Sequence, residues 1–131
     1  MRRSFTLIEI LIVVLILGIL STVSLIHLNR VIERSRWLEA RMILNELRLG
    51  QKKLEISGLP LCEAEYDPTV QGFKCINVYF TESKYFDYRL WRTRFVAEAK
   101  RKSGPLVNRV MYIDIDGNLD YTGDTPDWVK Y

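Results

Sequence analysis

Histidine and cysteine, which carry much of the catalytic and metal-binding chemistry of proteins, are scarce in this chain. Its 131 residues include one histidine, His27, and two cysteines, Cys62 and Cys75. Because His27 lies in an apolar run, neither a Ser/His/Asp nor a Cys/His arrangement is expected elsewhere in the chain. The cysteine spacing matches neither a CxxC redox pair nor a zinc site. The sequence also has no glycine-rich phosphate-binding loop, so we expect no enzyme activity and no cofactor.

An excess of charge of one sign is also lacking. The 19 lysine and arginine residues face 16 aspartate and glutamate residues, which leaves a net charge of +3. So slight an excess gives no reason to expect strong binding to nucleic acid. One stretch, from Arg89 to Arg109, is basic and contains aromatic residues, a composition that also occurs in DNA-binding surfaces. A solvated sheet face, or pairing with the acidic carboxyl-terminal tail, explains the same pattern, and nucleic acid is not an expected partner.

Polar residues are nearly absent from one end of the chain. From Phe5 to Leu28 the only charged side chain is Glu9. A helix over these residues would be roughly 36 Å long, enough to cross a hydrocarbon core of about 30 Å. Three interpretations fit: a secretory signal peptide, a plain signal anchor, or a membrane segment with a further task. Glu9 favours the third, because an ionisable residue inside a membrane segment is costly and usually functional.

The residues at this end resemble a known signal. Arg2-Arg3-Ser4, followed by the apolar run Phe5–Leu20 with Glu9 in it, resembles the class III signal of bacterial type IV pilins and type II secretion pseudopilins. The resemblance implies that a prepilin peptidase cuts between Ser4 and Phe5 and methylates the new amino terminus of Phe5. It also implies a bacterial inner-membrane precursor that pilus or type II secretion machinery assembles into a periplasmic or extracellular filament. The chain departs from the family in having Ser4 in place of the usual Gly and Ile26 where many members have Pro.

Glu9 would become the fifth residue of the processed chain. We hypothesise that its carboxylate pairs with the Phe5 amine of a neighbouring subunit, so that assembly satisfies a charge that lipid solvates poorly. Two simpler roles fit as well. Glu9 is protonated, or it caps the first helical turn by accepting hydrogen bonds from the free amides there.

The apolar run predicts the start of a much longer helix. Neither Pro nor Gly interrupts Ser21–Leu49, and the stop signal Ser57-Gly58-Leu59-Pro60 predicts an end near Ile56. Ser21–Ser24 is the stretch with the lowest helical propensity, and local melting there is one possibility. Beyond residue 30 the helix has two apolar stripes on nearly opposite sides. The first stripe is Val31, Leu38, Met42, Leu49 and Ile56, and the second is Ile32, Ala40, Ile43, Leu44, Leu47 and Leu54.

A helix that packs on one domain needs one apolar face, and this helix has two. We infer that one stripe covers a sheet of the same chain and that the other meets helices of neighbouring subunits. The alternative is that a curved sheet or a long loop covers both stripes.

The remaining residues predict a loop and then a sheet. Residues 57–84 contain Gly and Pro without a sustained period, as in a connecting loop. A disulfide between Cys62 and Cys75 would close this loop and stabilise the fold by about 3 kcal/mol, and two buried free thiols are the alternative. Alternating residues then predict antiparallel strands over 85–91, 94–100, 110–115 and 118–121, with Asp116-Gly117 as a hairpin turn.

The expected fold class is therefore α+β, a long amino-terminal helix packed on a small antiparallel sheet, which resembles a pilin. The expected divisions are a leader (1–4), a membrane and assembly segment (5–28), an amphipathic helix half (29–56), a connecting loop (57–84), and a sheet with the carboxyl-terminal tail (85–131).

A weak calcium pattern lies at the predicted hairpin. Asp114, Asp116, Asn118 and Asp120 alternate oxygen ligands, and some pseudopilins, which the amino terminus resembles, bind calcium in a carboxyl-terminal loop. An EF-hand would place its Gly later and end in Glu. Because a turn explains Asp-Gly between two strands, we expect no metal site.

The function expected from these features is that of a structural subunit of a type IV pilus-like filament, a helical homo-oligomer held in membrane lipid before assembly. One alternative is a minor pilin or pseudopilin with a binding role in the globular part. The other is a monomeric membrane-anchored binding domain.

Overall fold

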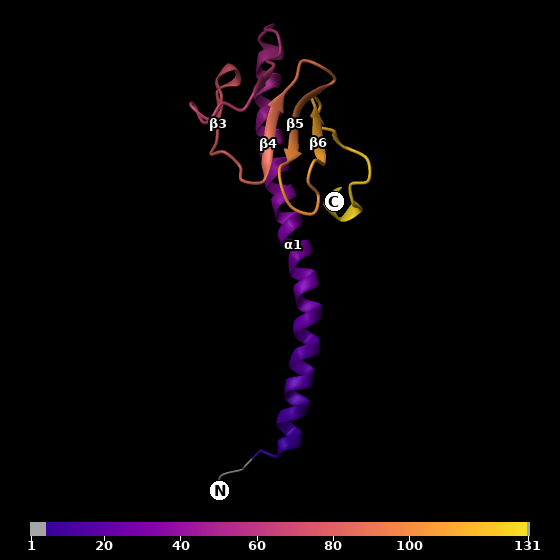
Figure 1. Ribbon diagram of the computed structural model, residues 1–131. Coiled ribbons are helices and arrows are strands. Elements are labelled where there is room, and N and C mark those ends of the chain that lie inside the picture. The colour runs from indigo at the N-terminus through magenta and orange to yellow at the C-terminus, as the bar shows by residue number, and fades with distance from the viewer. Residues whose placement is uncertain (1–4, 131) are drawn as a thin grey trace. The chain divides into compact units, whose positions relative to one another are not determined.

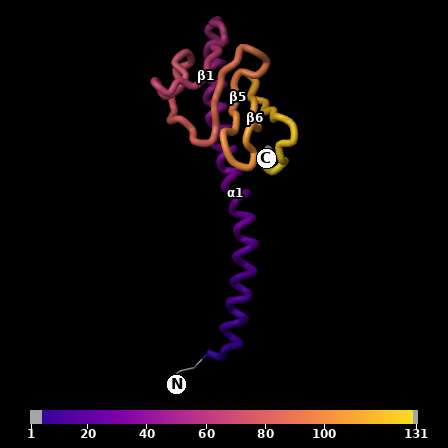
Figure 2. Tube along the Cα trace, viewed as in Figure 1, coloured from indigo at the N-terminus to yellow at the C-terminus, as the bar shows by residue number. Residues whose placement is uncertain are grey.

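The computed structural model describes residues 5–130, whose elements are labelled in Figure 1 and traced in Figure 2. The chain divides into two units, one that extends to Ser35 and one that begins at Arg36. A single long helix, α1 (Leu7–Ile56), contributes to both. It ends at Ile56, where the Gly58 and Pro60 stop signal predicts its end.

The first unit consists mainly of the apolar half of α1. Its most hydrophobic window has a mean hydropathy of 2.7 and no buried residue, and among the described residues α1 is the one helix long and apolar enough to cross a membrane. The stretch of low propensity, Ser21–Ser24, is helical throughout. The hydroxyl of Ser21 donates to the carbonyl of Leu17 at 2.7 Å, and that of Thr22 donates to the carbonyl of Ile19 at 2.8 Å. These bonds pair both hydroxyl groups within the helix, as an apolar environment would require.

The second unit contains a five-stranded antiparallel sheet in the order β1-β4-β5-β6-β7. Strands β4 to β7 form a meander, as the alternating pattern predicts, and Tyr88, Ala99, Met111 and Tyr121 lie side by side across it. The register shifts at one place, between Phe95 and Ala97. The strands are β1 (Ala64–Glu65), β4 (Phe86–Leu90), β5 (Phe95–Arg101), β6 (Val110–Asp114) and β7 (Leu119–Tyr121).

One face of this sheet packs on the part of α1 that follows Arg36 (Figure 1). Trp37 contacts Phe86 edge to face, with the ring centroids 5.0 Å apart. The helix contributes Trp37, Ala40, Leu44 and Leu47 to the core, and the sheet contributes Phe86, Tyr88, Leu90, Ala97, Ala99, Met111 and Ile113. This α+β arrangement confirms the predicted fold class.

The two predicted stripes of α1 differ in burial within this unit. Leu44 and Leu47 of the second stripe are fully buried. Leu38, Met42, Leu49 and Ile56 of the first stripe are exposed at 46%, 71%, 47% and 78% of their surface. The alternative in which a sheet or loop of the same chain covers both stripes is therefore wrong for the described residues, because these four side chains of the first stripe stay exposed there.

The segment predicted as a plain connecting loop contains short pieces of regular structure. Besides β1, it forms the two-stranded sheet of β2 (Gly72–Phe73) and β3 (Val78–Tyr79), which flank the 3-10 turn η1 (Lys74–Ile76). A short helix, α2 (Asp127–Lys130), follows the sheet near the end of the chain. The turn η1 lies against α1 at Gly50, where an added Cβ would approach Ile76 to 2.9 Å. A larger residue at position 50 would therefore push η1 away from the helix.

Candidate functional site

The first candidate site is the start of α1, where Glu9 caps the helix. The Glu9 carboxylate accepts hydrogen bonds from the backbone N–H of Thr6 at 2.7 Å and from its hydroxyl at 2.8 Å. The backbone N–H of Glu9 in turn donates to the Thr6 hydroxyl at 3.4 Å. This reciprocal pairing is a capping box, which satisfies free amides at a helix start. The structure thus contains the capping role, one of the two simpler roles considered for Glu9.

Capping uses only part of the Glu9 carboxylate. Both bonds go to Oε2, and the described part of the chain gives Oε1 no partner. Near Glu9 in the sequence, the apolar side chains of Phe5 and Leu7 are 78% and 84% exposed. The same residue can therefore cap its own helix and still accept a further donor. Of the predicted cleavage site, Phe5 is described, whereas Ser4 lies outside the described residues.

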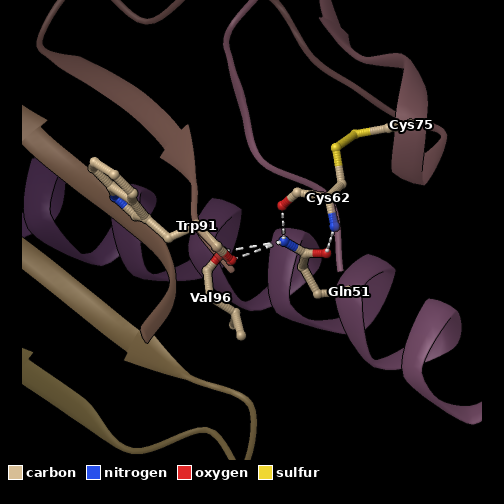
Figure 3. The surroundings of a disulfide bond; sticks show 5 residues. All are labelled: Gln51, Cys62, Cys75, Trp91 and Val96. Carbon is tan, nitrogen blue, oxygen red and sulfur yellow. Dashed lines mark hydrogen bonds between the residues drawn. A yellow bond between two sulfur atoms is a disulfide. The ribbon is translucent and has the colours of Figure 1, made fainter. Parts of the chain in front are cut away.

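The second candidate site surrounds a disulfide in the globular unit (Figure 3). The structure joins Cys62 to Cys75, with 6.2 Å between their Cα atoms, as the sequence predicts. Beside the bond, Gln51 of α1 is completely buried. Its amide donates to the carbonyl of Cys62 at 2.6 Å, and its Oε1 accepts the Cys62 N–H at 2.8 Å.

The Gln51 amide also connects this loop to the sheet. It lies 3.4 Å from the carbonyl oxygens of Trp91 and Val96, at the turn between β4 and β5 (Figure 3). One side chain of α1 thus holds the disulfide loop and one end of the sheet together. Its role is structural positioning, and sequence reasoning missed it. The signal was present, because position 51 follows Leu44 and Leu47 by seven and four residues and so lies on the buried stripe.

Two of the basic residues between Arg89 and Arg109 make contacts within the chain. Arg101 is buried at 1% exposure, with its guanidinium 5.1 Å from the ring centroids of Tyr85 and Phe86. Arg89 lies over the ring of Trp91 at 4.2 Å and pairs with a β1 carboxylate. These two cations therefore serve contacts within the chain, whereas Arg92, Arg94 and Lys100 are exposed.

Lys102, from the same stretch, connects two segments. Its amine lies 3.0 Å from carboxylate oxygens of both Glu82 and Asp87. Partial burial works against the charge, but the hydrogen bonds to the two carboxylates outweigh it and raise the pKa of Lys102. This lysine therefore stays charged and ties the end of the loop to β4.

The calcium candidates form a turn. Asp114 Oδ1 accepts the backbone N–H groups of Asp116 at 3.0 Å and Asn118 at 2.8 Å, and Oδ2 accepts the Asn118 side-chain amide at 2.8 Å. These bonds, that of the Asn118 side chain above all, lower the pKa of Asp114. Asp120 instead accepts the N–H of Tyr121 at 2.9 Å. Among the described residues, no group of three or more His, Cys, Asp or Glu side chains is placed to hold a metal ion.

Comparison with known proteins bears on the amino terminus. Residues 1–25 match the family profile described as a prokaryotic N-terminal methylation motif, which is the class III signal of type IV pilins and pseudopilins. The signal implies processing by prepilin peptidase and handling by pilus or secretion machinery, and with the apolar helix it fits a membrane-anchored precursor. Proteins with this motif are structural and not enzymatic. The chain has no significant match among curated proteins or solved structures.

Proposed function

We propose that this protein is a structural subunit of a type IV pilus-like filament and that it polymerises through the amino-terminal half of α1 after its leader is removed. The observation that carries the proposal is a methylation motif that leads directly into an apolar helix with no partner of its own. The motif covers residues 1–25, and the hydrophobic window of α1 has no buried residue.

The exposed half of α1 supports this function energetically. Its Leu, Ile and Val side chains from Leu7 to Leu28 are 48% to 84% exposed. Burying one such side chain contributes about 1.5–3 kcal/mol, so this segment needs lipid or protein around it. Membrane lipid serves the precursor, and the same segments of other copies serve the filament. The globular unit has its own core and needs no such cover.

In our proposal, the charge of Glu9 is less stable in membrane lipid than in the filament. In our proposal, cleavage between Ser4 and Phe5 removes Arg2 and Arg3 and leaves a new amine close to Glu9. The carboxylate keeps its cap on Thr6 through Oε2 and offers Oε1 to the Phe5 amine of the next copy. A charged hydrogen bond of this kind is stronger than a neutral one, and it is available only where helices of several copies meet.

Glu9 variants test this proposal because capping and charge pairing respond differently. Glutamine can replace glutamate in a capping box but carries no charge. Glu9→Gln and Glu9→Val, expressed in full-length chains with prepilin peptidase and the assembly machinery, should both insert in the membrane. Both should yield few filaments, measured in sheared and imaged material. Thr6→Ala is the matched control, since it removes the hydroxyl donor of the cap and keeps the carboxylate, and it should retain most of the filament yield.

Two results would contradict the proposal. If Glu9→Gln assembles as well as the wild type, the carboxylate acts only as a cap. If the wild-type protein keeps an intact Met1 and stays monomeric beside the complete machinery, the chain is an anchored monomer. Mass spectrometry of the mature amino terminus separates these cases, because processing predicts a methylated Phe5.

A further inference from the structure

The proposed function gives no task to the arginines that directly follow the apolar half of α1. Three of them, Arg30, Arg34 and Arg36, lie within eight residues of Leu28. The same stretch contains a single acidic residue, Glu33. The helix α1 runs through this stretch without a break (Figure 1). About two helical turns beside the membrane-spanning segment are therefore basic.

Two of these arginines are available to a partner outside the chain. The side chains of Arg30 and Arg34 are exposed, and within residues 5–130 neither guanidinium has an ion pair or a hydrogen bond. Arg36 instead lies 4.1 Å from the ring centroid of Tyr85, and Glu33 is only 4% exposed. Because arginine stays protonated in proteins, Arg30 and Arg34 carry permanent charges that the described part of the chain does not neutralise.

The helix places both guanidinium groups on one side and near one depth of a membrane. Residues four apart lie on the same side of a helix, about 6 Å apart along its axis. From Leu7, where α1 begins, to Arg30 the helix is about 35 Å long. A membrane is about 30 Å thick in its hydrocarbon core and about 40–45 Å thick with its headgroups. When Leu7 lies at one border of the core, Arg30 therefore lies in the headgroup layer at the other, and Arg34 can extend its side chain back into that layer.

The orientation of the proposed precursor makes these charges unfavourable by themselves. Basic residues beside a membrane segment favour the cytoplasmic side. The proposed function places the chain after Leu28 on the opposite side, so Arg30 and Arg34 oppose this orientation. A contact with an anion at the outer surface offsets that cost, and lipid phosphate groups are the anions found at this depth.

We infer that Arg30 and Arg34 form a binding site for the phosphate group of an anionic phospholipid, in the leaflet that faces away from the cytoplasm. A guanidinium group binds phosphate through two parallel N–H···O bonds, and such charge-assisted bonds are strong. A zwitterionic headgroup has a cation beside its phosphate, so a headgroup without a cation is the better partner for two arginines. The inference rests on the membrane-bound precursor of the proposed function and adds the class of lipid that it binds.

Such a site would fix the depth of α1 in the membrane. Moving the helix toward the cytoplasm by one or two turns would carry Arg30 and Arg34 away from the phosphates and into hydrocarbon, which is costly for a charged side chain. The proposed cleavage site precedes Phe5, two residues before α1 begins. Lipid held at one end of the span thus keeps the other end near the opposite headgroup layer, where the leader is to be removed.

Lipid retention by the full-length chain tests the site without peptidase or assembly machinery. The protein is reconstituted in nanodiscs that contain equal amounts of phosphatidylcholine and phosphatidylglycerol, and native mass spectrometry identifies the lipids that stay bound. The wild type should retain about fivefold more phosphatidylglycerol than phosphatidylcholine. Arg30→Gln/Arg34→Gln should retain nearly equal amounts of the two lipids.

The matched control removes the same charge elsewhere. Arg92→Gln/Arg94→Gln changes two exposed arginines of the globular unit and should keep the wild-type lipid ratio. Circular dichroism should show the same helix content in all three proteins, since glutamine and arginine have similar helix propensities. Excess inorganic phosphate in the buffer should not change the wild-type ratio, because the membrane holds the lipid phosphate beside the site.

The outcomes separate this inference from the proposed function. The inference is overturned if Arg30→Gln/Arg34→Gln keeps the wild-type lipid ratio, and a loss of filaments in that case would mean that these arginines act between copies. It is also overturned if the control lowers the ratio equally, which would make the preference an effect of net charge, or if inorganic phosphate abolishes it. If the wild-type chain does not enter the bilayer at all, the proposed membrane-bound precursor fails. If it enters without preferring phosphatidylglycerol, only the lipid site fails.

Discussion

The two regions of α1 handle apolar surface in different ways. Up to Leu28 the helix is apolar on all sides, and the side chains of this half lie exposed. From Trp37 onward one face is buried, with Leu44 and Leu47 inaccessible, while Met42 on the opposite face is 71% exposed. The second region therefore obtains its stability from its own sheet, whereas the first depends on its surroundings.

This difference separates two kinds of measurement. Substitutions on the buried face should change the free energy of unfolding of the globular unit. Substitutions in the first region, or on the exposed stripe, should leave that free energy nearly unchanged and alter membrane insertion or assembly instead. The predictions below challenge this division, beginning with the largest effect.

Leu44→Ala should lower the free energy of unfolding by about 2–5 kcal/mol, because it leaves a cavity between α1 and the sheet. Leu49→Ala is the matched control on the exposed stripe, and it should change stability by about 0.5 kcal/mol or less. Urea unfolding in detergent, followed by tryptophan fluorescence, to which the buried Trp37 contributes, measures both. Equal losses would mean that the two faces are not distinct.

Loss of the disulfide should have the second-largest effect on the free energy of unfolding. Cys62 and Cys75 are 13 residues apart, and cross-linking a loop of that size stabilises by about 3 kcal/mol. The double variant Cys62→Ala/Cys75→Ala should lose about this amount, and a reducing agent should bring the wild-type protein close to it. Further loss when the reductant is added to the double variant would show that reduction acts elsewhere.

Gln51→Met should lower stability by about 1–3 kcal/mol, since it leaves the buried N–H and carbonyl of Cys62 without their partner. Lys52→Met, at the neighbouring half-exposed position, serves as the comparison and should have little effect. Thermal unfolding under oxidising conditions keeps the disulfide intact in both variants. If Gln51→Met were neutral, the amide contacts in Figure 3 would contribute nothing to the fold.

The smallest effect concerns pH. Hydrogen bonds to the Asp114 carboxylate, above all from Asn118, lower its pKa in the folded protein. Its contribution is therefore complete above the ordinary pKa of about 3.9 and is lost as the pH falls through the lower, folded value. The melting temperature of the wild type should drop slightly more than that of Asp114→Asn between pH 7 and pH 3. An identical drop in both would show that the turn does not depend on this carboxylate.

Much of the fold follows from the residues alone. The stop signal at Gly58 and Pro60 predicts the end of α1. Alternation predicts the four longer strands, because each repeats a pattern over several positions or follows a clear turn such as Asp116-Gly117. The short strands β2 and β3 were not predictable this way. Each has two residues, and their pairing depends on the tertiary packing of Phe73 and Ile76 against the rest of the core.

The candidate sites divide in the same way. The methylation motif is a local sequence signal, and so is the Thr6–Glu9 capping box. Gln51 and Arg101 were missed because their residue types are usually exposed, and only a folded chain shows that backbone carbonyls and aromatic rings receive them.

The short edge strands of the sheet affect how it can pair with another molecule. Its outermost strands, β1 and β7, are the shortest of the five, with two and three residues. A long free edge offers a ladder of unpaired amides on which another molecule can add a strand, and short edges deny it that template. Copies of this chain brought close together would thus meet only short sheet edges, which disfavours pairing of their sheets into amyloid-like ribbons.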